Sequence, residues 1–469
     1  MKKTQTKRIA SWQENIRAAS PFVILCGCVA VFYFLYRIVL IAYPVAIIEQ
    51  NAFNPKHPEV VVCGQEEGSH LKDPAPVLSA SYQKRIHDQA PLGSNLVPNP
   101  GLNDVDQETG QPVGYGHSIE NDTSKYQYLQ EADKPGSLFL RTTDTQKDSN
   151  APTPPAWLTD FATVEPEHTY AYSFEYRSNT PVKVSIEYTK KDGKTGYIGV
   201  VTLKPAKTWQ LFTAHFDNTA DIASIRIDTN GTIPGIVDTR AFDIHRIKDA
   251  ELSKGLVSVT FDDGWESVDS HALELLTKHH IRTTQYIISD VAAKSVPEYM
   301  NYDAVTRFKK AGHEIGSHSL THCNQTKLDT ASIKNNAIAS KQTLEQQKLG
   351  PITSFAYPLG QYNEATQDIF SKHYQFIRTS DYGFNDRYFD ETNVHSIGIL
   401  DTTTDHELKM WLDFAKTHHQ WVVFVYHRVN DSGEYNVTTQ QLDRQLDLIS
   451  QSGLQTLPLG EAGKQIRHN

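Results

Sequence analysis

The chain contains 469 residues, enough for two or three domains with separate hydrophobic cores. Its 21% charged and 10% aromatic residues are typical of folded proteins and exclude a largely disordered chain. The formal net charge of −10 argues against nucleic acid as a partner, because phosphate binding requires a basic surface. The four cysteines are too scattered to predict a disulfide pairing.

The N-terminal part of the chain is a basic segment followed by a long apolar one. Residues 1–21 are rich in lysine and arginine, and residues 22–48 are almost wholly apolar, with Arg37 as their only charge. Such a span can cross a hydrocarbon core of about 30 Å, and basic residues before it favour a cytoplasmic N-terminus. We predict a cytoplasmic tail at 1–21 and one transmembrane helix at 22–48. A cleaved signal peptide is the alternative, and both place the remainder outside the cytoplasm, at the cell surface or in the periplasm.

Residues 49–93 contain several prolines and scattered charges, with only one short strand-like run. This composition predicts a linker or stalk that holds the rest of the chain away from the membrane. The alternative is an extended strip packed on a domain.

Residues 94–249 alternate between short strand-like runs and turn residues, without sustained helical periodicity. This spacing is typical of an all-β sandwich or jelly roll. The predicted strands include 170–176, 182–188, 196–203, 210–216 and 223–227.

From about residue 250 to 469, strand-like runs alternate with helical stretches. Repeated βα units predict a parallel sheet, here closed as a barrel. The predicted strands are 257–261, 283–288, 314–318, 354–358, 376–378, 394–397, 422–426 and 455–458, and the predicted helices are 267–279, 302–311, 331–347, 364–373 and 439–451.

The first strand of this region ends in two adjacent carboxylates, Asp262 and Asp263, followed by a glycine. Alone, such a sequence is usually a turn. The carboxyl ends of parallel strands, however, are where α/β barrels place their reactive groups. Successive strand side chains alternate faces, so one carboxylate can bind a metal while the other remains beside it as a base.

Two histidines, His318 and His322, stand four residues apart, and we predict that one helical turn places them on the same face. With Asp263 they would form a three-ligand set suited to a divalent metal such as zinc, leaving a position for water. Asp262 would then act as general base, and His427, arriving on a separate strand, as general acid. These are the parts needed for metal-assisted hydrolysis of an amide or ester.

Four stretches in this order resemble the motifs of NodB-type polysaccharide deacetylases, carbohydrate esterase family 4. They are TFDDGW at 260–265, GHEIGSHSLTH at 312–322, AYPLG at 356–360 and VYH at 425–427. The resemblance implies a distorted (β/α) barrel, a metal usually taken as zinc, and removal of acetyl groups from polymers of N-acetylated sugars. By motif, it implies Asp262 as base, His427 as acid, and Asp263, His318 and His322 as metal ligands.

The middle motifs depart from the family pattern. Ala356 stands where many members have an arginine that orients the base, so Arg378 and Arg428 are candidates to replace it. Asp381 lies where it could tune His427, since a carboxylate partner raises the pKa of an imidazole. Aromatic and loop residues near the motifs are candidate sugar contacts. These are Trp265, Tyr382 and Pro358.

The upstream region resembles a carbohydrate-binding module of the jelly-roll type. The resemblance rests on NLVPNPGL at 95–102 and KTWQLFTAHF at 207–216. It implies sugar binding, for which Trp157, in a proline-rich stretch, is the better stacking candidate, whereas Trp209 is better explained as core.

Together these features predict a membrane-anchored enzyme that removes N-acetyl groups from an extracellular amino-sugar polysaccharide. The polymer would be an exopolysaccharide such as poly-N-acetylglucosamine, or peptidoglycan. Two alternatives are open: an O-acetyl polysaccharide esterase, and a non-catalytic, membrane-anchored carbohydrate-binding protein that retains the barrel.

Overall fold

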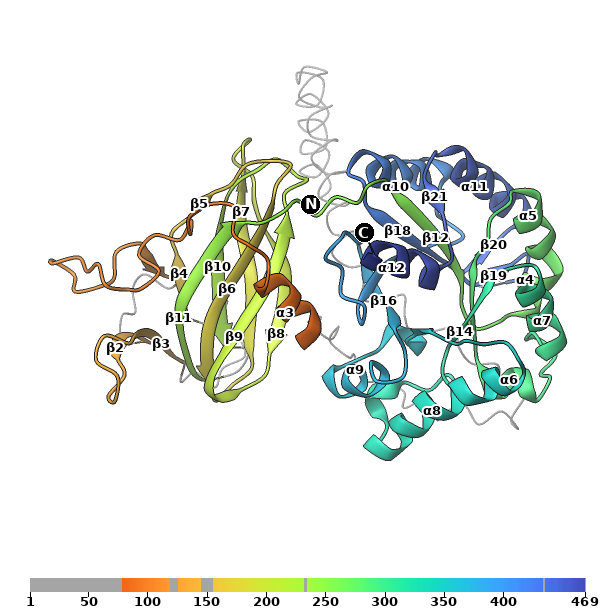
Figure 1. The fold of residues 1–469 in the computed structure, drawn as a ribbon, viewed down its shortest axis with the longest axis horizontal. Helices are drawn as coiled ribbons and strands as arrows, with labels where there is room; N and C mark the ends of the chain where they lie inside the picture. Colours follow the sequence, from red (N-terminus) through yellow and green to blue (C-terminus); the bar gives the residue numbers. More distant parts are fainter. Residues whose placement is uncertain (1–77, 119–124, 145–154, 232–233, 433–434, 469) are drawn as a thin grey trace, which may run out of the picture. The chain divides into compact units, whose positions relative to one another are not determined.

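The computed structural model describes residues 78–118, 125–144, 155–231, 234–432 and 435–468 (Figure 1). The chain divides into two units, Met1–Phe53 and Asn54–Asn469. The predicted tail at 1–21, the predicted membrane helix at 22–48 and the linker up to residue 77 lie outside the described residues. Within the described ranges, no helix has the length and apolar character needed to cross a membrane.

The last part of the predicted linker is a helix. Helix α3 (Ala80–His87) begins after Ser79, whose hydroxyl accepts a hydrogen bond from the N–H of Tyr82. Tyr82 and Ile86 lie on one side of this helix and are buried in the core of the β region that follows. Their burial explains why the segment 80–87 is ordered and does not behave as a free stalk.

The β region consists of two antiparallel sheets. The sheets share one core, because Val184 and Ile225 of the first sheet pack with Phe174 and Phe212 of the second. The two-sheet prediction is therefore confirmed, while the jelly-roll and sugar-binding assignments stay predictions. The first sheet contains β1 (Tyr115–His117), β4 (Ala156–Thr159), β5 (Ala162–Thr163), β7 (Val182–Lys190), β8 (Thr195–Leu203) and β10 (Ile222–Gly231); the second contains β2 (Tyr126–Gln130), β3 (Leu138–Asp144), β6 (Thr169–Ser178), β9 (Ala206–Asp217) and β11 (Gly235–Arg246).

Trp157 is a core residue and not an exposed sugar platform. It belongs to β4, is only 1% exposed, and its indole N–H donates to the carbonyl of Arg141 at 3.0 Å. The hypothesis that Trp157 stacks on a sugar is wrong, since no face of its ring is accessible. Trp209, in contrast, lies beside the guanidinium groups of Arg177 and Arg240, 4.6 and 4.0 Å from its ring centre.

Residues from 256 onward form a closed barrel of seven parallel strands. The ring closes because β12 pairs with both β18 and β13. The strand β21 (Gln455–Thr456) pairs with the first two residues of β12. The seven strands are β12 (Leu256–Phe261), β13 (Thr284–Ile287), β14 (Glu314–Ser317), β15 (Ser354–Ala356), β16 (Phe376–Tyr382), β17 (Val394–Gly398) and β18 (Trp421–Tyr426).

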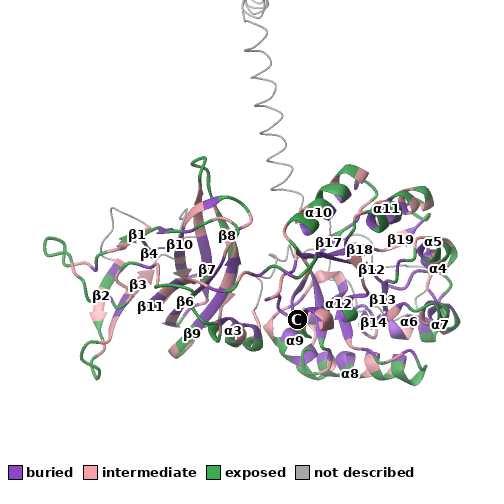
Figure 2. Cartoon of the chain, turned by 45° about the horizontal axis from the view of Figure 1, so that its top comes forward, coloured by how far each residue is buried: buried purple, intermediate pink, exposed green. Residues whose placement is uncertain are grey.

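Helices surround the barrel strands (Figure 1). Strands β12 and β18 are buried along their whole length, which is why they read as continuous apolar runs, while helices such as α8, α10 and α11 turn exposed faces outward (Figure 2). The helices are α4 (Glu266–His271), α5 (Leu273–Lys278), α6 (Ser289–Ala293), α7 (Tyr302–Lys310), α8 (Thr330–Gln346), α9 (Glu364–Phe370), α10 (Asp405–Thr417), α11 (Thr439–Gln451) and α12 (Leu459–His468), with short turns η2 (Gln325–Lys327) and η3 (Pro358–Gly360) and a small sheet of β19 (Arg428–Val429) and β20 (Asn436–Val437).

His313, just before β14, should make the fold sensitive to acid. It is 4% exposed, and its Nδ1 accepts the N–H of Thr283 at 3.0 Å. Burial, with a contribution from Arg282, lowers the pKa of His313 from 6.5 to about 4. The folded protein therefore binds this proton more weakly than the unfolded chain does. The contribution of His313 to stability is full above the unfolded pKa and is lost as the pH falls towards 4, a change of about 3 kcal/mol.

Replacing His313 with glutamine should flatten the dependence of the unfolding free energy on pH between about 4 and 6.5. Chemical denaturation at several pH values measures this slope. The exposed His406 on α10 offers a matched control, because its replacement by glutamine should leave the slope unchanged. An equal slope in the wild type and the His313→Gln variant would contradict the assignment.

Candidate active site at the carboxyl ends of the barrel strands

Asp262 and Asp263 follow the last residue of β12, and both are buried. The backbone N–H of Asp262 donates to the carbonyl of Tyr426, which fixes the end of β12 against the end of β18. Asp263 and Gly264 adopt φ angles of 71° and 73°, in the left-handed region. This turn, and not the predicted alternation along a strand, points the two adjacent carboxylates towards different partners.

His318 and His322 meet in a loop after β14 and not on a helix. The loop turns through positive φ angles of 68° at Ser319 and 59° at His322, and the N–H of His322 donates to the Ser319 hydroxyl at 2.9 Å. The prediction of a helical turn is wrong, because the serine hydroxyl bonds the backbone in a non-helical conformation. The predicted convergence is nevertheless found: the Nε2 atoms of His318 and His322 lie 3.3 and 3.1 Å from Oδ1 of Asp263.

The orientation of His318 is set by a backbone group of the third motif. Its Nδ1 lies 2.9 Å from the carbonyl oxygen of Ala356, so an N–H at Nδ1 donates to that carbonyl and leaves Nε2 free to face Asp263. Ala356 thus contributes through its main chain to the position of a predicted metal ligand.

Asp263, His318 and His322 fit a divalent metal. One ligand atom from each residue lies within 4.8 Å of the others, all three residues are buried, and Oδ1 of Asp263 has no hydrogen-bond partner among the described residues. Burial alone would raise the pKa of Asp263, but the two imidazoles hold it well below its ordinary value. A buried, ionised carboxylate beside two imidazole nitrogens is a donor set typical of zinc.

Arg378, a candidate replacement for the arginine missing at Ala356, contacts Asp262. Its guanidinium forms a buried ion pair with Oδ2 of Asp262 and lies over the ring of Tyr286, 5.3 Å from the ring centre. Ala356 on β15 and Arg378 on β16 are register partners in the parallel pairing of these strands. An arginine one strand away, at the same height in the barrel, therefore reaches the proposed base.

Arg428 has a different position. Its guanidinium carbon lies 3.7 Å from the centre of the Trp265 ring. Of the two candidates for replacing the motif arginine, the structure thus brings Arg378 and not Arg428 to Asp262.

His427 follows the last residue of β18 and lies at the same site. Its Nε2 is 3.9 Å from Oδ2 of Asp262, and its side chain is 22% exposed. Burial lowers the pKa of His427, although Asp262 and Asp263 act in the opposite direction. A partly exposed imidazole next to the proposed base can reach a bound substrate with its Nε2.

The predicted partnership between Asp381 and His427 is not found. Oδ2 of Asp381 accepts the hydroxyl of Tyr362 at 2.6 Å, and Nδ1 of His427 has no hydrogen-bond partner within the described ranges. Asp381 lies at the end of β16, where the strand directs it towards Tyr362 and away from His427.

Of the three predicted sugar contacts, two are buried. Trp265 is 3% exposed, and Pro358 is buried at the start of η3. Both predictions are wrong for the same reason, since neither side chain presents a surface to a sugar. Tyr382 is 68% exposed at the end of β16, and its hydroxyl accepts the indole N–H of Trp411 at 3.1 Å, so it stays a candidate.

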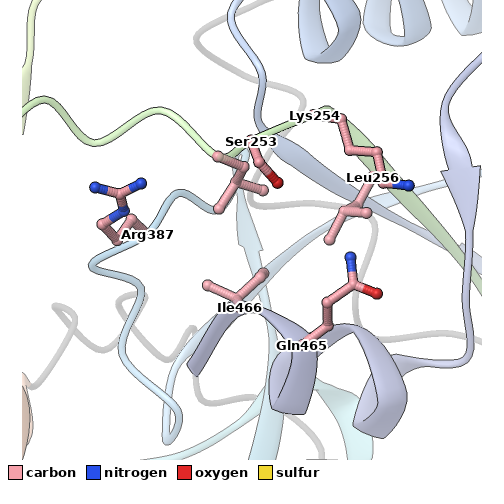
Figure 3. Close-up of a pocket in the computed structure, with 7 residues that line it drawn as sticks. Ser253, Lys254, Leu256, Arg387, Gln465 and Ile466 are labelled. Carbon is pink, nitrogen blue, oxygen red and sulfur yellow. The ribbon is translucent and has the colours of Figure 1, made fainter. Parts of the chain in front are cut away.

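A separate pocket of about 290 Å³ lies near the beginning of β12 (Figure 3). Residues 252–254 and Leu256 line it together with Arg387 and two residues of α12. It contains none of the predicted site residues, so the chemistry predicted from the sequence lies elsewhere, at the carboxyl ends of the strands.

Residues 249–375 match the model of the polysaccharide deacetylase family. This stretch contains the first four strands of the barrel, β12 to β15, and is similar to polysaccharide deacetylases. The match includes Asp262, Asp263, His318 and His322 of the candidate site, whereas Arg378 and His427 lie beyond it.

The chain is similar to parts of several known proteins. A chitin deacetylase from Pestalotiopsis is 30% identical over 101 residues, covering 22% of this chain and 33% of its own length. A peptidoglycan-N-acetylglucosamine deacetylase from Listeria monocytogenes is 28% identical over 109 residues, covering 23% of this chain and 22% of its own length. The crystal structure of the Xyl-CE4 domain of a xylanase from the hindgut metagenome of Trinervitermes trinervoides gives a TM-score of 0.34 at 17% identity, covering 45% of this chain and 91% of that one. The chain thus spans about a fifth to a third of the length of these curated relatives.

Proposed function

We propose that this protein is a metal-dependent hydrolase that removes N-acetyl groups from an extracellular amino-sugar polysaccharide. The observation that carries the proposal is the convergence of two sets of groups. The ligand set Asp263, His318 and His322 lies directly beside Asp262, which is paired with Arg378 and faces His427. A carbohydrate-binding protein without catalytic activity would not need a base, an acid and a metal site together.

The geometry supports a division of labour between these residues. Asp262 acts as the general base and takes a proton from the attacking water. Arg378 holds the carboxylate of Asp262 in the orientation needed for this step. His427 gives a proton to the amine as the carbon–nitrogen bond breaks, and the products are acetate and a free amine. A divalent cation held by the three ligands would supply Lewis-acid polarisation of the acetyl carbonyl and of the water.

Two observations support an amino-sugar polymer as substrate. Parts of the chain are similar to enzymes named for chitin and for peptidoglycan N-acetylglucosamine. In addition, the exposed ring of Tyr382 stands at the carboxyl end of β16, where a flat aromatic surface can pack on a pyranose.

Location outside the cytoplasm is part of the proposal. It is supported by the basic and apolar segments at 1–21 and 22–48, and by Cys323, which follows His322 and is disulfide-bonded. The two-sheet region would then hold the polymer near the membrane, as its resemblance to carbohydrate-binding modules implies. Recovery of the full chain in the soluble fraction of fractionated cells would contradict the anchor.

The deciding experiment measures acetate release from a panel of substrates. The zinc-loaded protein should release acetate from poly-N-acetylglucosamine, peptidoglycan or chitin oligomers, and the Tyr382→Ala variant should raise KM several-fold with little change in kcat. Release from acetylated xylan in place of these substrates would favour the O-acetyl esterase. Binding to a glycan without acetate release from any substrate would contradict the enzyme.

A further inference from the structure

The two oxygens of Asp263 have different surroundings. Oδ1 faces the imidazoles of His318 and His322, whereas Oδ2 accepts the indole N–H of Trp265 at 2.9 Å. This hydrogen bond is fully buried.

The backbone turn at residues 262–265 brings the side chains of Asp263 and Trp265 together. Positive φ angles at Asp263 and Gly264 reverse the chain, so that the side chain of Trp265 returns to the carboxylate two residues before it. A Cβ at Gly264 would lie 3.0 Å from the Cδ1 atom of Ile287, so a larger residue would both strain and crowd the turn. The carbonyl of Gly264 is also held, because it accepts the N–H of Met300 at 2.7 Å.

Aromatic and cationic groups hold the indole in place. The Tyr299 ring stacks on Trp265 with centroids 4.3 Å apart and an interplanar angle of 23°. Arg428 contributes the second contact, with its guanidinium carbon 3.7 Å from the ring centre. Because Arg428 directly follows His427, this contact connects the indole to the strand end that carries the proposed acid.

We propose that Trp265 is a positioning residue of the metal site: its N–H fixes Oδ2, so that Asp263 presents Oδ1 alone towards the metal. The inference rests on the proposed metal-dependent function and deepens it. It also assigns a use to the tryptophan that follows Asp-Asp-Gly, which the sequence suggested as a sugar contact. Partners that orient a ligand from behind commonly change metal affinity by about 10- to 100-fold when they are removed.

The test is the zinc affinity of the Trp265→Phe variant, measured by competition with a chromophoric chelator. Phenylalanine keeps an aromatic ring for Tyr299 and Arg428 but has no N–H. We expect the dissociation constant for zinc to increase by about tenfold or more. The matched control is Trp421→Phe, which removes another buried indole donor, bonded to Ser258 and remote from Asp263, and should leave zinc affinity unchanged.

If the Trp265→Phe protein does not fold, a second variant tests the same proposal. Arg428→Gln keeps the indole N–H and removes one contact that holds it, so zinc binding should weaken by a smaller factor. If the wild type binds zinc and both variants bind it with the same affinity as the wild type, this inference is wrong but the proposed function is not affected. Wild-type protein that binds no zinc would overturn the proposed metal-dependent function and the inference with it.

Discussion

Replacing Asp262 with asparagine should lower kcat for acetate release by about 10³-fold while the protein still binds zinc. The amide cannot take a proton from water, and general-base catalysis contributes about 10²- to 10⁴-fold in enzymes. Zinc binding should survive, because the ligand atoms belong to Asp263, His318 and His322. Metal content and acetate release, measured on the same preparation, check both parts.

The matched variant is His318→Ala. It removes a proposed ligand, so zinc content and activity should be lost together. Equal loss of zinc from the Asp262→Asn and His318→Ala proteins would contradict the separation between base and ligands. Thermal unfolding of both proteins is needed as a control, since Asp262→Asn leaves the buried Arg378 without its charged partner.

The second large effect concerns Arg378. Replacing it with methionine should lower kcat substantially and destabilise the fold by about 3 to 5 kcal/mol, because the carboxylate of Asp262 is then buried without a partner. Kinetics and chemical denaturation measure the two effects.

A double variant makes this prediction specific. Ala356 and Arg378 are register partners, so an arginine at 356 combined with Arg378→Ala should return a guanidinium to Asp262 from the neighbouring strand. Partial recovery of kcat, compared with Arg378→Ala alone, would support the replacement. Activity of Arg378→Met equal to that of the wild type would refute a positioning role for this arginine.

The sequence predicts the barrel well because its strands are buried on both faces. Continuous apolar runs such as β12 and β18 differ clearly from the helices between them, and the predicted helix at 439–451 has the bounds of α11. Helix α10 is missed although Thr404 and Glu407 form a capping box at its start. Strand β11 is not among the strands named from the sequence, and polar residues interrupt its apolar pattern.

Some of the predicted site residues are positioned by the strand order, and others by local backbone angles. Asp262, Asp263, His318, His322 and His427 are brought together because all follow parallel strands whose ends meet at one edge. The burial of Trp265 could not be predicted from the sequence pattern, because the direction of its side chain depends on two positive φ angles in the preceding turn. The same holds for Asp381, whose direction depends on how β16 ends.

The register between β15 and β16 has a consequence for how inactive members of such a family are recognised. A parallel barrel places residues of neighbouring strands at one height, so a charge can move sideways by one strand and still serve the same carboxylate. A comparison that reads each motif alone finds the alanine at 356 and overlooks the arginine one strand away. Scoring the two positions jointly would separate a relocated arginine from a lost one, and an alanine in the third motif would no longer mark a domain as degenerate.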